Sequence, residues 1–112
     1  MVMQLQPSDF EQWRRAQGDA APMVLDVREP WEVQTASIKA EGFELQVIAM
    51  GEVPSRWQEL DPNRPIACLC HHGMRSLQVA RYLQQQGFAE VVNLQGGIDA
   101  WSSAVDPTVP RY

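Results

Sequence analysis

Short apolar runs of strand length recur along the chain. They are separated by stretches in which apolar residues have the spacing of an amphipathic helix. The runs expected to form strands are residues 23–27, 44–47, 66–69 and 91–94. Strands joined by helical crossovers lie parallel in one sheet, with helices covering both of its faces. The pattern therefore predicts an α/β fold in three layers, with a central parallel sheet flanked by helices.

Five stretches are expected to be helical. Ser8 and Glu11 have the spacing of a capping box, and Gly18 is expected to end the helix that follows them. Pro30 suits the first turn of a short helix that runs to about residue 35. The remaining helical patterns cover residues 53–60, residues 76–86 and a last face at 98–101.

Length and composition describe one ordinary folded domain, 1–112. The chain of 112 residues is 45% hydrophobic and 21% charged, with a formal net charge of −5. Its apolar runs stay far below the roughly 18–20 residues of a membrane span, and its first residues do not have the pattern of a secretory signal. An acidic chain also lacks the basic face that nucleic acid requires. We therefore expect no membrane and no nucleic-acid partner.

The two cysteines, Cys68 and Cys70, are separated by one residue. Side chains at this spacing in a strand diverge from disulfide geometry, and a bridge between them would close almost no loop. Free thiols are typical of a reducing compartment, so we expect a cytoplasmic protein. Cys68 is expected to be a core residue, with a resolving thiol as the alternative, whereas Cys70 follows the end of the strand.

The most distinctive chemistry lies in the loop Cys70-His71-His72-Gly73-Met74-Arg75-Ser76, between an apolar strand and an amphipathic helix. Ligands of parallel sheets bind beyond the carboxyl ends of the strands, which is where Cys70 falls. Gly73 allows a tight curl that directs successive N–H groups inward at a helix N-terminus. Arg75 adds a permanent cation. Together these groups favour a thiolate over a thiol and predict a nucleophilic Cys70.

Two further motifs accompany this loop, Asp26-Val27-Arg28-Glu29-Pro30-Trp31-Glu32 upstream and Asn93-Leu94-Gln95-Gly96-Gly97-Ile98-Asp99-Ala100-Trp101 downstream. With the three motifs in this order, the chain resembles a single-domain rhodanese, a bacterial thiosulfate sulfurtransferase. The resemblance extends from about residue 20 to residue 112. The chain departs from that family at residues 36–42. Rhodaneses usually have a His-Ile-Pro-Gly-Ala-like segment there, and only Ile38 is clearly retained.

The resemblance implies a rhodanese-like fold with a five-stranded parallel sheet. It also implies that Cys70 accepts a sulfane sulfur as a persulfide and passes it to a second nucleophile. The donor would be a small sulfur anion such as thiosulfate, and the acceptor would be cyanide or a thiol, including a thiol carried by a protein. No cofactor is implied. The loop that binds the substrate and the persulfide would consist of His71, His72, Gly73, Met74, Arg75 and Ser76.

Three other functions fit parts of the pattern. A Cys-dependent phosphatase or arsenate reductase typically has five residues between its cysteine and arginine, whereas four separate Cys70 from Arg75. A rhodanese-like binding module or persulfide carrier is the non-enzymatic alternative, although inactive members typically lack the loop cysteine. A metal site at Cys68, Cys70, His71 and His72 is disfavoured because four ligands within five residues do not readily converge on a tetrahedral ion.

The two arginines near the loop each have two expected roles. Arg28 is expected either to attract an anionic donor or to form a structural ion pair with Asp26, Glu29 or Glu32. Arg75 is expected to bind the substrate, the carbonyl groups of its own loop, or both.

Three further features of the loop and its surroundings can be predicted. Ser76 is expected to be the N-cap of the helix, with its hydroxyl available to the loop. His71 and His72 are expected to contribute N–H groups and line the mouth of the site, without acting as a general base. The proline-containing segment 105–112 is expected either to be mobile or to fold over the mouth.

Overall fold

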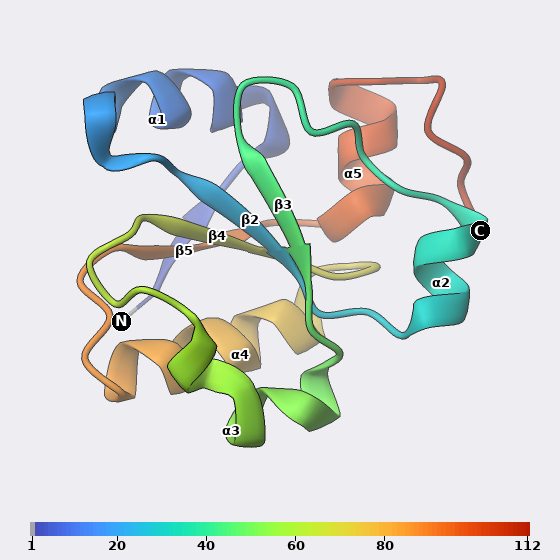
Figure 1. Ribbon diagram of the computed structural model, residues 1–112. Helices are drawn as coiled ribbons and strands as arrows, with labels where there is room; N and C mark the ends of the chain where they lie inside the picture. Colours follow the sequence, from blue (N-terminus) through green and yellow to red (C-terminus); the bar gives the residue numbers. More distant parts are fainter. Residues whose placement is uncertain (1) are drawn as a thin grey trace.

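The computed structural model describes residues 2–112, in which a twisted sheet separates two layers of helices (Figure 1). The strands are β1 Met3–Leu5, β2 Met23–Asp26, β3 Glu44–Val47, β4 Ile66–Leu69 and β5 Val91–Leu94. They lie in the order β1-β5-β4-β2-β3, and every neighbouring pair is parallel. The predicted α/β fold with a central parallel sheet is confirmed.

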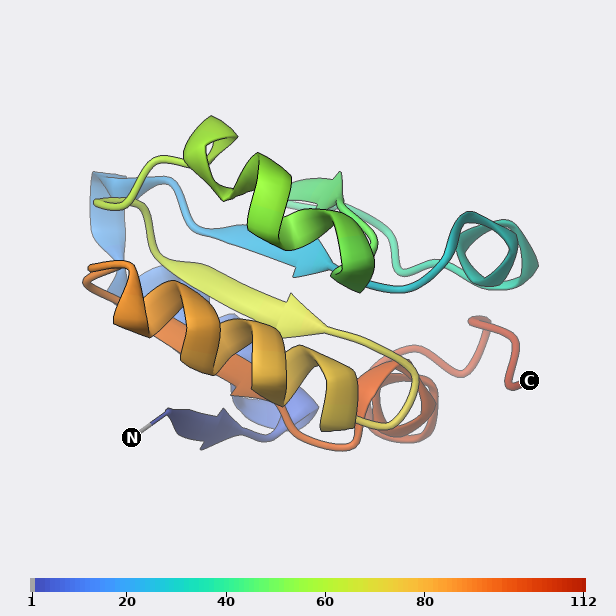
Figure 2. The same cartoon turned by 90° about the horizontal axis from the view of Figure 1, so that it is seen from below.

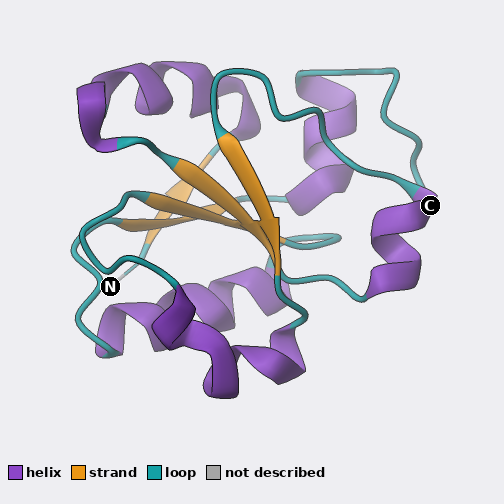
Figure 3. Cartoon of the chain, viewed as in Figure 1, coloured by secondary structure: helices purple, strands orange, loops and turns teal. Residues whose placement is uncertain are grey.

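The helices are α1 Phe10–Ala16, α2 Pro30–Thr35, α3 Val53–Arg56, α4 Met74–Gln85 and α5 Gly97–Ala104. Helices α3 and α4 cover one face of the sheet and α1 and α5 cover the other, while α2 lies beyond the carboxyl ends of the strands (Figure 1 and Figure 2). Figure 3 shows a loop between α2 and β3, where the chain departs from the rhodanese pattern. No helix within residues 2–112 is long and apolar enough to cross a membrane.

Strand β1 is the one strand that the hydrophobic pattern does not predict. The polar Gln4 interrupts the apolar residues of this segment, and of its three residues only Leu5 is buried. The segment adds to the edge of the sheet beside β5, with Gln4 opposite Asn93. A strand this short is stabilised by its pairing partner, and its own sequence carries too few buried positions to show alternation.

Two of the expected elements differ from the structure in kind as well as in their boundaries. The capping box predicted from Ser8 and Glu11 does not form, because α1 begins at Phe10 after the 3-10 turn Pro7–Asp9 and Glu11 pairs with Arg14 and Arg15. The predicted helix 53–60 consists of α3 followed by the 3-10 turn Trp57–Glu59. In that segment Val53 and Leu60 are buried, as the predicted apolar face requires.

Alternation along β4 divides the core into two parts. Ile66 and Cys68 belong to the cluster between the sheet and helices α3 and α4, and Ala67 and Leu69 belong to the cluster on the side of α1 and α5. This is the two-residue period of a strand that is buried on both faces. Cys70 continues the first series, so the strand delivers it to the face that α4 covers.

Candidate active site

Cys70 lies where β4 ends and the loop to α4 begins. The residue is 1% exposed, and its Sγ accepts the backbone N–H of Gly73 at 3.0 Å and lies 3.3 Å from the Ser76 hydroxyl oxygen. Gly73 has a φ of 96°, a region that favours glycine, and this conformation lets the chain fold back onto the sulfur. Because α4 begins at Met74, the positive end of the helix dipole lies beside the loop.

Four further N–H groups of the loop are available to a ligand. Within the described chain, no protein acceptor is bonded to the backbone N–H of His71, His72, Met74 or Arg75. Unbonded N–H groups at a helix N-terminus form a site for an anion. The loop can therefore hold a negatively charged group next to Cys70.

The loop rests on the start of α5. The carbonyl oxygens of Cys70 and His71 accept the N–H groups of Ile98 at 2.9 Å and Asp99 at 3.2 Å. Gly97 makes this approach possible, because a Cβ atom built there would lie 2.4 Å from the His71 oxygen and 2.5 Å from the Cys70 oxygen. The glycine pair in the downstream motif thus supports the loop that carries the thiol.

Ser76 does not cap α4, contrary to the prediction. The N-cap is Gly73, and Ser76 lies in the first turn of the helix, where its hydroxyl donates to Asn93 Oδ1 at 2.6 Å. Asn93 Nδ2 in turn donates to the Gly73 carbonyl at 3.0 Å and to Gln4 Oε1 at 2.8 Å. Sequence reasoning missed the role of Asn93, although a polar residue inside the buried run 91–94 is a signal that could have revealed it.

Arg75 is bound to a carboxylate rather than directed at the sulfur. Its Nη1 and Nη2 donate to Glu32 Oε1 at 2.7 Å and Oε2 at 2.9 Å. Glu32 is 3% exposed, and the hydrogen bonds from Arg75, with smaller contributions from the N–H of Glu29 and the Tyr112 hydroxyl, lower its pKa from 4.5 to about 2. The expectation that Arg75 bonds the carbonyl groups of its own loop is not met, because its two terminal nitrogens bind a side chain of α2.

Arg28 does not face the exterior, so the expectation that it attracts an anionic donor is not met. The side chain is fully buried and donates to Asp26 through Nε and Nη2 at 2.7–3.2 Å. Its remaining contacts are the Ala36 carbonyl at 2.8 Å, the Glu32 carbonyl at 3.3 Å and the Tyr112 hydroxyl at 2.9 Å. The alternative prediction of a structural ion pair with Asp26 describes this residue.

The C-terminal segment folds over the loop. The Tyr112 ring stacks on His71 with centroids 3.9 Å apart, and His72 stacks on His71 at 4.0 Å. The Tyr112 hydroxyl accepts from Arg28 and donates to Glu32 Oε2 at 2.9 Å. Among the buried polar side-chain atoms of residues 2–112, His71 Nε2 is the one without a partner. Of the two alternatives predicted for segment 105–112, the structure has the one in which it covers the mouth.

Cys68 lies in the core, as the first of its two predicted roles requires. It is fully buried, and desolvation raises the pKa of its thiol well above the ordinary range, with a smaller contribution from Cys70. Both cysteines are free thiols. Within the part of the chain that the structure describes, no three His, Cys, Asp or Glu side chains are placed to hold a metal ion.

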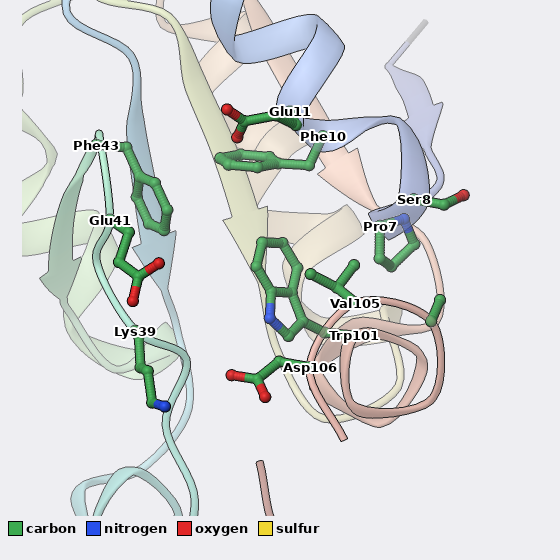
Figure 4. Close-up of a pocket in the computed structure, with 11 residues that line it drawn as sticks. Pro7, Ser8, Phe10, Glu11, Lys39, Glu41, Phe43, Trp101, Val105 and Asp106 are labelled. Atoms are coloured by element: carbon green, nitrogen blue, oxygen red, sulfur yellow. The ribbon is translucent and has the colours of Figure 1, made fainter. Parts of the chain in front are cut away.

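A cavity of about 470 Å³ lies away from the loop, on the face covered by α1 and α5. Figure 4 shows Phe10, Phe43 and Trp101 in its walls and Lys39 and Glu41 at one side. None of its lining residues carries a thiol or an imidazole, and none belongs to the loop 70–76. The thiols and imidazoles of residues 2–112 therefore lie outside this cavity.

Cys70 and its loop follow the central strand of the sheet. The chain that carries them matches a known domain family. The rhodanese-like domain matches residues 7–104. The chain belongs to the rhodanese-like domain family. This assignment agrees with the resemblance carried by the three motifs. Relatives named as sulfurtransferases support a place among the rhodanese-like sulfurtransferases.

Individual relatives of this rhodanese-like chain share most of its length. Putative sulfurtransferase YtwF of Bacillus subtilis (strain 168) is 37% identical over 95 residues, which are 83% of this chain and 85% of that protein. Rhodanese-like/PpiC domain-containing protein 12, chloroplastic, of Arabidopsis thaliana is 42% identical over 91 residues. These residues are 80% of this chain, which spans only 30% of the plant protein.

A solved structure confirms the fold of the rhodanese-like chain. The crystal structure of a rhodanese-related protein from Thermoplasma volcanium superimposes with a TM-score of 0.79 at 29% sequence identity. The match covers 99% of this chain and all of the other.

Proposed function

We propose that this chain transfers a sulfane sulfur from a donor such as thiosulfate to cyanide or a thiol through a persulfide on Cys70. In the first step the Cys70 thiolate attacks the outer sulfur of thiosulfate. The new Sγ–S bond forms as the donor S–S bond breaks, and sulfite leaves with the electron pair. In the second step cyanide or a thiolate attacks the outer sulfur of the Cys70 persulfide and regenerates the thiolate.

One observation carries this proposal, namely the surroundings of Cys70 Sγ. The sulfur accepts an N–H from Gly73, and four other loop N–H groups have no protein acceptor within residues 2–112. These donors can hold the terminal sulfur of the persulfide, because N–H groups at a helix N-terminus stabilise a negative charge. Once the thiolate is present, sulfur transfer removes no proton, so the proposal assigns the His71 and His72 side chains no role as a base.

Phosphate transfer is less well supported by the same geometry. A phosphatase of this kind needs a guanidinium to bind the phosphate oxygens, and both terminal nitrogens of Arg75 are bound by Glu32. Four residues also separate Cys70 from Arg75, which makes a smaller loop than the five that are typical of those enzymes. Hydrolysis of p-nitrophenyl phosphate without any thiosulfate:cyanide activity would favour the phosphatase.

The decisive experiment is intact mass spectrometry after incubation with thiosulfate and removal of the donor. We expect a gain of about 32 Da, one sulfur, located on Cys70 by peptide mapping. Cys70→Ser should abolish both the mass gain and the transfer, whereas Cys68→Ala should retain both. Adding cyanide should remove the extra mass and release thiocyanate, and steady-state rates should follow ping-pong kinetics. Sulfur transfer by the folded Cys70→Ser variant would refute the proposal.

The cellular setting stays a prediction. We propose a cytoplasmic site of action, because two free thiols are maintained in a reducing compartment. The acceptor is proposed to be a small thiol or a thiol carried by a protein.

A further inference from the structure

A continuous network of charged side chains borders the loop. Asp26 binds Arg28, Arg28 donates to the Tyr112 hydroxyl, Tyr112 donates to Glu32, and Glu32 binds Arg75. The network joins the end of β2, the C-terminal segment, α2 and the first turn of α4. It contains two guanidinium groups and two carboxylates, so its formal charges cancel.

The balance of charge matters most at Arg75, because this is the cation closest in sequence to Cys70 and its net charge sets how strongly it attracts an anionic donor. Its side chain is 35% exposed, but its two terminal nitrogens are bound in parallel by the Glu32 carboxylate. A guanidinium in such a pair attracts a further anion much less than a free one does, since the field of the carboxylate opposes its own. The loop therefore receives an incoming donor with N–H dipoles and little net positive charge from side chains.

Two exposed apolar side chains lie in the loop or beside the C-terminal residue that stacks on it. Met74, inside the loop, is 70% exposed, and Trp31 on α2 is 62% exposed. The Trp31 ring meets the Tyr112 ring edge-on, with centroids 6.2 Å apart, and Tyr112 stacks on His71 of the loop. Exposed apolar groups next to a reactive residue suit a ligand that has an organic part. Thiosulfate has no such part, whereas a persulfide R–S–S⁻ does.

We propose that Glu32 determines donor specificity, because by neutralising Arg75 it disfavours dianionic donors such as thiosulfate and favours organic persulfides of lower charge. This inference rests on the proposed function and deepens it. With a persulfide, the Cys70 thiolate attacks the outer sulfur of R–S–S⁻. The Sγ–S bond forms, the donor S–S bond breaks, and R–S⁻ leaves with the electron pair. The products are a Cys70 persulfide anion and a thiolate, so atoms, charge and oxidation state balance without a further reactant.

Glu32→Gln tests the inference because it removes the charge and keeps the size and one oxygen acceptor. The two donors compared are thiosulfate and the persulfide of 2-mercaptoethanol, with cyanide as the common acceptor. We expect kcat/KM to rise about tenfold for the dianion and about threefold for the persulfide, so the ratio shifts toward thiosulfate. The thiosulfate rate of the variant should also fall more steeply with ionic strength than that of the unmodified chain.

The matched control is Glu44→Gln. Glu44 at the start of β3 binds Arg64, so its replacement also removes one carboxylate from an ion pair, but at the opposite end of the sheet from the loop. The donor ratio of this variant should equal that of the unmodified chain. A shift as large as that of Glu32→Gln would mean that net charge alone sets the ratio, and would overturn the inference.

Arg75→Gln removes the cation of the pair and should shift the donor ratio away from thiosulfate. This test can be made even if Glu32→Gln fails to fold. The substitution leaves the Glu32 carboxylate uncompensated, so thiosulfate should lose about tenfold in kcat/KM and the persulfide about threefold. Combining the two substitutions should restore the original ratio. The ratio of kcat/KM between thiosulfate and the persulfide could stay constant in all folded variants while Cys70 still gains a sulfur. That result would refute the role of Glu32 but not the proposed function. A Cys70 that gains sulfur from neither donor would instead refute the proposed function.

Discussion

Replacing Gly97 by alanine should damage the loop from a position outside it. Gly97 has a φ of 62°, which costs an L-residue about 1–2 kcal/mol. Its new Cβ would lie 2.4 Å from the His71 carbonyl oxygen, so the loop would have to retreat by roughly 0.6 Å to reach 3.0 Å. Overpacking of this kind typically costs about 1–3 kcal/mol. We therefore expect the variant to lose about 2–5 kcal/mol of unfolding free energy.

The same displacement should lower activity, because Cys70 and His71 are the residues that must move. A shift approaching 1 Å at a reacting centre can reduce the rate up to a hundredfold, so we expect a loss of 10- to 100-fold in kcat. Urea unfolding gives the stability, and thiocyanate release gives kcat at a temperature where circular dichroism shows the variant folded.

Gly87→Ala separates the cost of a positive φ from the cost of the contact between the new Cβ and the loop. Gly87 has a φ of 97° but no atom within 4 Å of its ideal Cβ position, so its replacement carries the backbone cost without the contact. We expect it to lose about 1–2 kcal/mol and to retain full activity. If Gly97→Ala loses no more stability than Gly87→Ala and keeps its kcat, the loop does not rest on α5 as described.

Two further predictions concern the charged network. Because the folded-state pKa of Glu32 is lowered from 4.5 to about 2, its ion pair should stabilise the fold above pH 4.5. This contribution, at most about 3.4 kcal/mol, should be lost as the pH falls toward 2. The stabilities of Glu32→Gln and the unmodified chain, measured by urea unfolding, should therefore converge there. Tyr112→Phe keeps the ring that stacks on His71 but removes the hydroxyl between Arg28 and Glu32, and should cost about 1–3 kcal/mol in the same measurement. An unchanged midpoint for Tyr112→Phe would show that the C-terminal segment does not hold this contact.

The apolar strand 66–69, followed by a small loop and an amphipathic helix, was enough to predict the position of Cys70. A continuous apolar run predicts a strand buried on both faces, and in a parallel sheet the residue after such a strand lies at the edge where ligands bind. The fate of Cys68 follows from the same run, because it lies within the strand while Cys70 lies at its end. These features depend on neighbours a few residues away, so local sequence carries them.

The pairings of polar groups could not be predicted in this way. Arg75 meets Glu32 across 43 positions of sequence, and Tyr112 meets Glu32 across 80. Which carboxylate a given arginine binds depends on how α2 is placed beyond the sheet, and several candidates were open for Arg28. Asn93 bonds to Gly73 and Ser76 only because β5 lies next to β4.

By itself, the sequence determined the alternation of strands and helices, the parallel sheet and the place of the thiol, because hydrophobic periodicity and glycine positions are properties of short segments. Only the tertiary structure decided that β1 completes the sheet, that Gly97 supports the loop and that Glu32 neutralises Arg75. Those contacts join segments that are far apart in the chain, and they exist only after burial has brought them together.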